Sequence, residues 1–105
     1  MNPKSKELIE TLNKLILFLN DADENNWINW AVDSKERIEQ TDLTGVDNII
    51  RAYSGMGSFN DLVIYQLNED VENPDIDIEK TKKLSEMKSL IFKLAVRLKK
   101  NFRIN

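Results

Sequence analysis

The sequence predicts an all-α fold, a single-domain bundle of four helices with a Gly-rich loop after the third. Apolar residues recur three and four positions apart in four separate stretches, the spacing of helices with one buried face. No stretch shows a convincing strand alternation. Only three Gly and two Pro among 105 residues leave little room for long irregular segments. Because this is a common length for one domain, we expect residues 1–105 to form a single helical domain.

The first two helices are expected to pack through leucine and aromatic positions. The first should run from about residue 4 to 20, with Leu8, Leu12, Leu15 and Leu19 repeating at helical spacing. The second should follow Asp23, whose side chain can cap a helix start, and end near Gln40. Its expected buried positions are Trp27, Trp30 or Ala31, Ser34 and Ile38.

The third helix and its loop are marked by turn residues. Asp42 should cap a helix extending to Tyr53, although Gly45 near its start is an unfavourable helix residue. Ser54 and Gly55 should end it, because glycine readily takes the left-handed conformation that closes many helices. Ser58 and Asp61 then have the spacing of a capping box. The β-prone residues 62–65 form either a short extended segment or a distorted helical turn.

The longest helix is expected at the end of the chain. An acidic loop around Pro74 should lead to Asp77, which would cap a helix over residues 78–102. Its apolar stripe consists of Leu84, Met87, Ile91, Leu94, Ala95, Leu98 and Phe102.

Charge is distributed very unevenly along the chain. Residues 80–105 carry nine Lys/Arg and one acid, whereas residues 20–79 carry three Lys/Arg and fifteen acids. The formal charges of these segments are +8 and −12, although the whole chain carries only −3. A surface of one sign attracts partners of the opposite sign, so this distribution favours a recognition role.

Composition argues against an enzyme and against membrane insertion. The chain has no His and no Cys, so the commonest general base and every thiolate nucleophile or ligand are missing. Alternating carboxylates between Asp70 and Asp77 lack the spacing and glycine of an EF-hand loop, so no metal or other cofactor is expected. The apolar run Leu15–Leu19 is too short for a membrane span, and no secretory signal begins the sequence. We therefore expect a cytoplasmic protein.

One block supports a family resemblance. Residues Gly55 to Leu62 read Gly-Met-Gly-Ser-Phe-Asn-Asp-Leu and follow Arg51 and Tyr53. This arrangement resembles a family of small, uncharacterised bacterial proteins that share such a block and end in a Leu-rich helix. Family members often continue with a histidine-containing turn, which residues 67–70 of this chain replace with Leu-Asn-Glu-Asp. The resemblance implies a compact helical bacterial domain and brings no established activity.

The same block is a candidate ligand site or a structural turn. Its glycines could free backbone N–H groups to hold an anion, but the lysine and spacing of a Walker loop are missing. The favoured interpretation is a tight turn, with Arg51 paired to Asp47 or Asp61. The candidate residues of this loop motif are Arg51, Gly55, Gly57, Ser58, Asn60 and Asp61.

Two classes of function, with a third less favoured, follow from these features. The leading hypothesis is an immunity protein that neutralises a basic toxin domain by direct binding through an acidic surface. That surface would consist of Asp21, Asp23, Glu24, Asp33, Glu36, Glu39, Asp42 and Asp47. The alternative is a small-ligand or nucleotide sensor using the loop motif, and the third is a subunit that pairs with itself through the aromatic second helix. Nucleic acid is not a favoured partner, because no reading-helix motif precedes the basic last helix, whose cations should lie on its solvent side.

Overall fold

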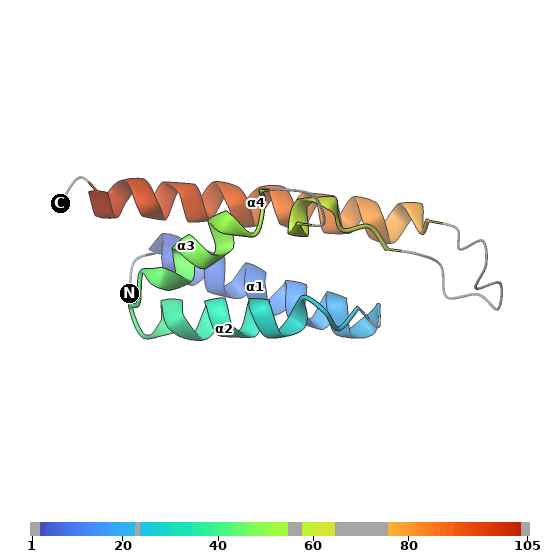
Figure 1. Cartoon of the computed structure of the whole chain (residues 1–105), viewed down its shortest axis with the longest axis horizontal. Coiled ribbons are helices and arrows are strands. Elements are labelled where there is room, and N and C mark those ends of the chain that lie inside the picture. Colours follow the sequence, from blue (N-terminus) through green and yellow to red (C-terminus); the bar gives the residue numbers. More distant parts are fainter. Residues whose placement is uncertain (1–2, 23, 55–57, 65–75, 104–105) are drawn as a thin grey trace.

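The computed structural model describes residues 3–22, 24–54, 58–64 and 76–103, and within these ranges it confirms the all-α fold (Figure 1). The elements are α1 (Pro3–Asp21), α2 (Ile28–Glu39), α3 (Thr44–Arg51), the 3₁₀ turn η1 (Phe59–Asp61) and α4 (Ile78–Arg103). In Figure 1, the axes of α1, α2 and α4 are roughly parallel, with the chain of α1 running opposite to that of α2 and α4, and short α3 crosses obliquely from the end of α2 to α4.

The four helices close around one leucine-rich core. Helix α1 packs against both α2 and α4, and α3 packs against the same two helices. The four leucines predicted for the buried face of α1 have no exposed surface. The stripe of α4 is also confirmed: Leu84, Ile91, Leu94, Ala95 and Leu98 are buried, and Met87 is partly buried. The Phe102 side chain lies outside the described part.

The second helix begins later than predicted. Asp23 lies outside the described residues, and α2 begins only at Ile28, after Trp27, which makes no side-chain capping bond. The Glu24 N–H donates instead to the Leu19 carbonyl at 2.8 Å, so this residue continues the turn that ends α1. The prediction for the buried face is nevertheless correct, since Ala31, Ser34 and Ile38 are buried.

The third helix ends earlier than predicted. Its last turns tighten because the N–H groups of Ala52, Tyr53 and Ser54 each donate to the carbonyl three residues back. Helix α3 therefore ends at Arg51, and Tyr53 lies beyond it. Gly55 is outside the described residues, so its predicted left-handed conformation stays a prediction.

Two predicted caps have different outcomes. Asp77 accepts a hydrogen bond from the Lys80 N–H at 3.0 Å, which confirms it at the start of α4. The capping box is wrong, because Ser58 makes no side-chain capping bond and only the single turn η1 follows it. Leu62 then has an extended backbone, and Ile64 is held to α4 by hydrogen bonds with Thr81 Oγ1. Of the two alternatives for residues 62–65, an extended segment or a distorted helical turn, the structure shows the extended one at Leu62. Tyr65 lies outside the described part.

Candidate functional site

A cluster of aromatic rings connects the start of α2, the end of α3, η1 and α4. Phe59 is fully buried at its centre, and its ring centroid lies 4.7 Å from that of Trp30 and 5.3 Å from that of Trp27. Tyr53 meets Phe59 edge-on at 5.5 Å and contacts Phe92 of α4 at 4.9 Å. Such tilted and edge-on contacts are the favourable geometries for aromatic pairs. The cluster fixes the position of the chain after α3.

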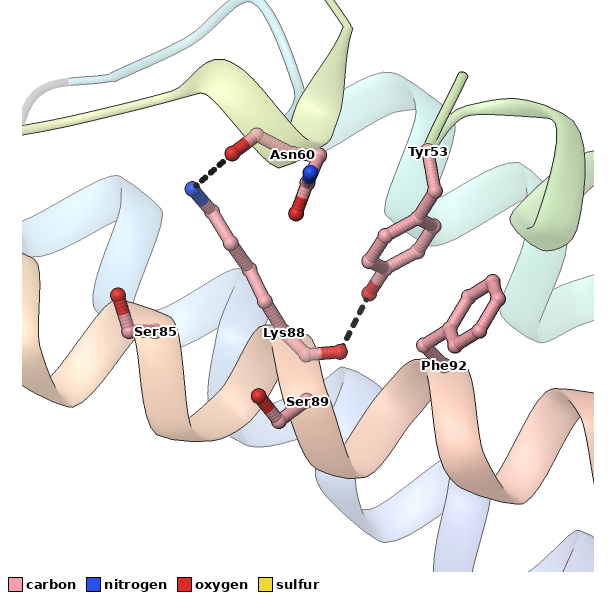
Figure 2. Close-up of a pocket in the computed structure, with 6 residues that line it drawn as sticks. All are labelled: Tyr53, Asn60, Ser85, Lys88, Ser89 and Phe92. Atoms are coloured by element: carbon pink, nitrogen blue, oxygen red, sulfur yellow. Dashed lines mark hydrogen bonds between the residues drawn. The ribbon is translucent and has the colours of Figure 1, made fainter.

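Beside this cluster lies a buried lysine. Lys88 of α4 is only 7% exposed, and its Nζ donates to the Asn60 carbonyl at 3.1 Å (Figure 2). The same Nζ also donates to the Leu62 carbonyl. The ammonium group also lies 5.8 Å from the Phe59 ring centroid. Burial lowers the pKa of Lys88, although the negative charge of Asp61 opposes this shift. Lys88 thus fastens the chain around η1 to the last helix.

The sequence predicts that Lys88, like the other cations of the last helix, lies on the solvent side. That prediction is wrong for this residue. The signal was its register, because Lys88 follows Leu84 by four residues and precedes Ile91 by three, on the buried stripe of α4. A lysine on an apolar stripe must either extend to solvent or find acceptors inside, and the carbonyls beyond α3 supply them.

A pocket of about 340 Å³ opens next to Lys88. Figure 2 shows Ser85 at one end of it, Tyr53 and Phe92 at the other, and Asn60 above. The Tyr53 hydroxyl donates to the Lys88 carbonyl at 2.8 Å, and burial raises the pKa of Tyr53 well above its usual value. The pocket therefore offers aromatic surface together with hydroxyl and amide groups.

A second hollow, of about 450 Å³, lies on the other side of the aromatic cluster. Trp27, Trp30, Asn48, Arg51 and Ser58 line it, with Ala52 and Ser54. The Trp30 Nε1–H donates to the Asn48 carbonyl at 3.3 Å, whereas Arg51 is exposed at the end of α3. We call it the Arg51 hollow. Its groups could receive a planar anion, since it combines aromatic surface, a guanidinium group and side-chain hydrogen-bonding groups.

The loop motif is only partly visible in this arrangement. Arg51 and Ser58 line the Arg51 hollow, and the Ser58 Oγ is buried with no hydrogen-bond partner among the described residues. Asn60 lines the other pocket, beside Lys88. Gly55 and Gly57 lie outside the described residues. The predicted ion pair of Arg51 with Asp47 or Asp61 stays a prediction; the Asp47 carboxylate lies 2.9 Å from the Lys99 ammonium of α4.

The residues of the predicted acidic surface form two groups, one near the start of α2 and one along it. Asp21 and Glu24 lie near its start, while Asp33, Glu36, Glu39 and Asp42 follow its exposed outer face and the next turn. Asp33 is the sixth residue of α2, about 7.5 Å along the axis from its start, and Glu39 is the last residue of the helix. Asp33 and Glu39 each pair with a cation of the same helix, at 3.1 Å with Arg37 and 3.7 Å with Lys35.

The turn from α2 into α3, which we call the acidic corner, has a defined backbone. The Thr41 N–H donates to Ile38 and the Asp42 N–H to Arg37, the two bonds of a Schellman motif. Thr41 occupies the left-handed position with φ of 58°, where glycine is the usual residue. The Asp42 carboxylate accepts from the Thr44 hydroxyl and N–H at 2.7 and 3.0 Å, which lowers the pKa of Asp42. Next to it, Leu43 is 45% exposed.

The described residues show neither a metal site nor a membrane span. No three acidic side chains within these ranges come close enough together to hold a metal ion. None of the described helices combines the length and apolar character needed to cross a membrane.

The fold and these surfaces define a small helical bundle with exposed charged faces and open hollows among its described residues. Residues 20–72, which comprise α2, α3 and η1, match the family described as "Domain of unknown function (DUF6966)". The chain belongs to this family, which confirms the predicted membership of an uncharacterised family. No curated protein and no solved structure matches the chain at a significant level.

Proposed function

We propose that this chain is a bacterial cytoplasmic immunity protein, which neutralises a basic toxin domain by binding it through the acidic corner and the outer face of α2. The observation that carries the proposal is an exposed apolar side chain, Leu43, at the end of a row of exposed carboxylates. Those carboxylates belong to Asp33, Glu36, Glu39 and Asp42. An apolar anchor with a charged rim is a common plan for a specific protein interface.

The charges on this face are available to a partner. The pairs Asp33–Arg37 and Lys35–Glu39 join exposed or half-buried side chains four residues apart on one helix. Such surface pairs contribute only about 0.3–0.5 kcal/mol, so a cationic partner can replace them at small cost. Asp42 stays ionised because the Thr44 hydrogen bonds favour its charged form. An acidic face of this kind accelerates the approach of a basic protein.

The geometry of the corner also suits inhibition. The Schellman motif and the close contact of α2 with α3 hold Leu43 in one position relative to the helix carboxylates. A rigid surface loses little conformational entropy on binding, which favours tight association. An inhibitor of this type needs shape and charge and no catalytic group. We also propose that the Gly55–Leu62 block is the sequence signature that members of the family share.

Affinity capture with a matched pair of variants tests the proposal. The tagged full-length chain is expressed in its own cells, and bound proteins are identified by mass spectrometry. We expect a basic protein to be recovered with the wild type and lost with the double variant Glu36→Lys, Glu39→Lys. The control reverses Glu7 and Glu10, which are exposed on α1, and makes the same change in net charge. Equal capture by both variants would exclude the α2 face.

Binding kinetics of the captured protein then test the role of the corner. Raising the salt concentration should slow association, because salt screens the attraction between exposed charges. Leu43→Ser should instead mainly raise the dissociation rate, since it removes the apolar anchor. Production of the captured protein alone should stop cell growth, and co-production of the wild-type chain should restore it. A captured protein that is harmless to growth would argue against immunity.

A second function is favoured by the Arg51 hollow, namely binding of a small anionic ligand such as a nucleotide. The observation in its favour is the Ser58 hydroxyl, which is buried at the hollow without a partner among the described residues. Trp27 and Trp30 line the same hollow, so their fluorescence reports binding directly. Titration with nucleoside monophosphates should change this fluorescence in the wild type and not in Arg51→Ala. No change in the wild type would dismiss this function.

A further inference from the structure

A second surface lies on α4, outside the acidic corner and the Arg51 hollow. Ser85 and Ser89 line the pocket beside Lys88 and also a neighbouring hollow of about 510 Å³. The neighbouring hollow is further lined by Lys82, Glu86, Leu90 and Lys93. Because the same two serines line both hollows, the hollows adjoin each other on the exposed side of the helix. We call the two hollows together the α4 groove.

Small and large side chains alternate in this groove. Ser85 and Ser89 are four residues apart, so their short side chains lie one turn above the other and form a low ridge. Phe92 on one side is 40% exposed, and Leu90 on the other is 38% exposed. The groove therefore presents two depressions edged by apolar side chains, which can receive side chains from a partner.

The surroundings of the groove are strongly positive. The exposed cations of the described part of α4 are Lys82, Lys83, Lys93, Arg97 and Lys100, against two exposed acids, Glu79 and Glu86. The cations lie on both sides of the serine pair along the helix. Lys99 is different, because it forms the ion pair with Asp47 of α3. The charge of this surface is opposite to that of the acidic corner, so it suits a different partner.

We propose that the α4 groove docks an acidic amphipathic helix of a partner protein. Apolar side chains of that helix enter the two depressions beside Ser85 and Ser89. Its Glu and Asp side chains meet Lys82 at one end and Lys93 at the other. This is helix-in-groove recognition, in which anchors spaced three and four residues apart fill hollows while flanking charges set specificity. The protein would then have two interaction surfaces of opposite charge.

The shape of the groove favours a helix over the other anionic partners. A nucleic-acid backbone offers phosphates and no apolar side chains, so it leaves both depressions empty. Binding of a helix to an anionic membrane requires a broad apolar face. The described part of α4 lacks one, because its exposed large apolar side chains are Leu90, Phe92 and, at its start, Ile78. Only a side-chain-bearing partner uses both the hollows and the cations.

Selection from a helix library tests this inference without a known partner. The library displays helices of about 18 residues, roughly five turns, with a constant apolar stripe and with Glu, Gln or Lys varied at the flanking positions. It is selected against the full-length wild-type chain. We expect the bound sequences to be enriched in Glu. Enrichment in Lys, or no enrichment, would overturn the proposal.

Variants of the groove then locate the site of the selected peptide. Ser89→Tyr places a large ring at a residue that lines both depressions and should weaken binding, measured by fluorescence anisotropy, by about tenfold or more, the equivalent of about 1.4 kcal/mol. The control Asn29→Tyr makes the same kind of change at an exposed position of α2. The double reversal Lys82→Glu, Lys93→Glu should shift the preference from Glu-flanked to Lys-flanked peptides. Circular dichroism establishes that each variant is folded.

The remaining outcomes are equally decisive. Unchanged binding by Ser89→Tyr would mean that the peptide binds elsewhere and would overturn the proposal. Tighter binding of duplex DNA or of phosphatidylserine vesicles than of the selected peptide, abolished by the double reversal, would assign the cations to those partners. Because the peptide assay does not involve Glu36 or Leu43, its failure leaves the acidic corner proposal intact, and the converse also holds.

Discussion

At the scale of single residues, Lys88 shows how one buried cation can order a segment that has little regular structure. The chain from η1 to Ile64 has few repeating hydrogen bonds of its own, so its carbonyls need partners from elsewhere. Lys88 supplies donors to two of them, and Thr81 supplies the hydrogen bonds at Ile64. The cost of burying the ammonium group is offset by these bonds and by its position over Phe59.

Replacing Lys88 by methionine should therefore destabilise the fold. Methionine retains most of the packing volume of the lysine stem but leaves the Asn60 and Leu62 carbonyls without this donor. We expect a loss of about 1–3 kcal/mol in the free energy of unfolding, measured by urea denaturation. Lys83→Met, at an exposed position of the same helix, should change it by less than about 0.5 kcal/mol. Equal effects would show that Lys88 is not buried.

Burial of the Tyr53 hydroxyl predicts that the stability of the fold decreases at alkaline pH. Its pKa is raised in the folded chain because its hydroxyl is buried, while in the unfolded chain it titrates near 10.0. Above pH 10.0 the unfolded state loses this proton first, so the contribution of Tyr53 to stability is complete below that pH and declines above it. The stability difference between wild type and Tyr53→Phe, from urea denaturation, should shrink as pH rises through 10. A difference independent of pH would contradict burial of the hydroxyl.

At the scale of elements, the crossing of α2 and α3 depends on a residue without a side chain. A Cβ atom at Gly45 would lie 2.8 Å from the Ser34 carbonyl oxygen and 2.9 Å from the Arg37 Cβ. The two helices approach closely at this point, which brings Asn48 Nδ2 within 2.9 Å of the Ser34 hydroxyl, to which it donates. A glycine that looked unfavourable within its own helix is thus required by the neighbouring one.

Gly45→Ala should destabilise the protein even though alanine favours helices. The gain in helix propensity is at most about 1 kcal/mol, whereas overpacking costs about 1–3 kcal/mol when backbone must move. We expect a net loss in the free energy of unfolding and a lower melting temperature. Asn29→Ala, an exposed change on α2, is the control and should be nearly neutral. A more stable Gly45→Ala variant would show that the helices separate easily.

At the scale of the whole molecule, the two charged regions lie on different parts of one bundle and are joined where α3 meets α4. The Asp47–Lys99 ion pair makes this connection at 2.9 Å. Most other charges on the outer faces of α2 and α4 remain exposed. Both proposed interfaces follow from this separation, because a bundle whose opposite charges were fully paired internally would attract neither partner strongly.

The bundle should unfold in one cooperative transition. Tryptophan fluorescence reports on the aromatic cluster around Phe59, and far-UV circular dichroism reports on all the helices, so the two urea curves should coincide. Leu94→Ala should shift both curves together by about 2–5 kcal/mol, because it leaves a cavity between packed helices. Leu17→Ala, at a position 70% exposed, is the matched control and should shift neither. Separate transitions would contradict the prediction that residues 1–105 form a single domain.

Much of the fold could be predicted from the sequence, because amphipathic periodicity is a local property. The leucines of α1, the stripe of α4 and the Asp77 cap were all predicted from residues within a few turns of each other. The uneven charge is likewise visible in the sequence itself. The candidate surfaces are predictable only in part: the sequence predicts the exposed carboxylates of α2, but it does not single out the proposed anchor Leu43 or the α4 groove.

The tertiary structure alone decided which distant residues meet. The Tyr53 hydroxyl reaches the carbonyl of Lys88, 35 residues away, and Lys88 reaches back to Asn60 across 28 residues. These contacts accompany the early end of α3 and the burial of a lysine that looks like a surface residue, and they shape the pockets on either side of Phe59. The pattern of one helix cannot reveal them, because each depends on the surface that another helix presents to it.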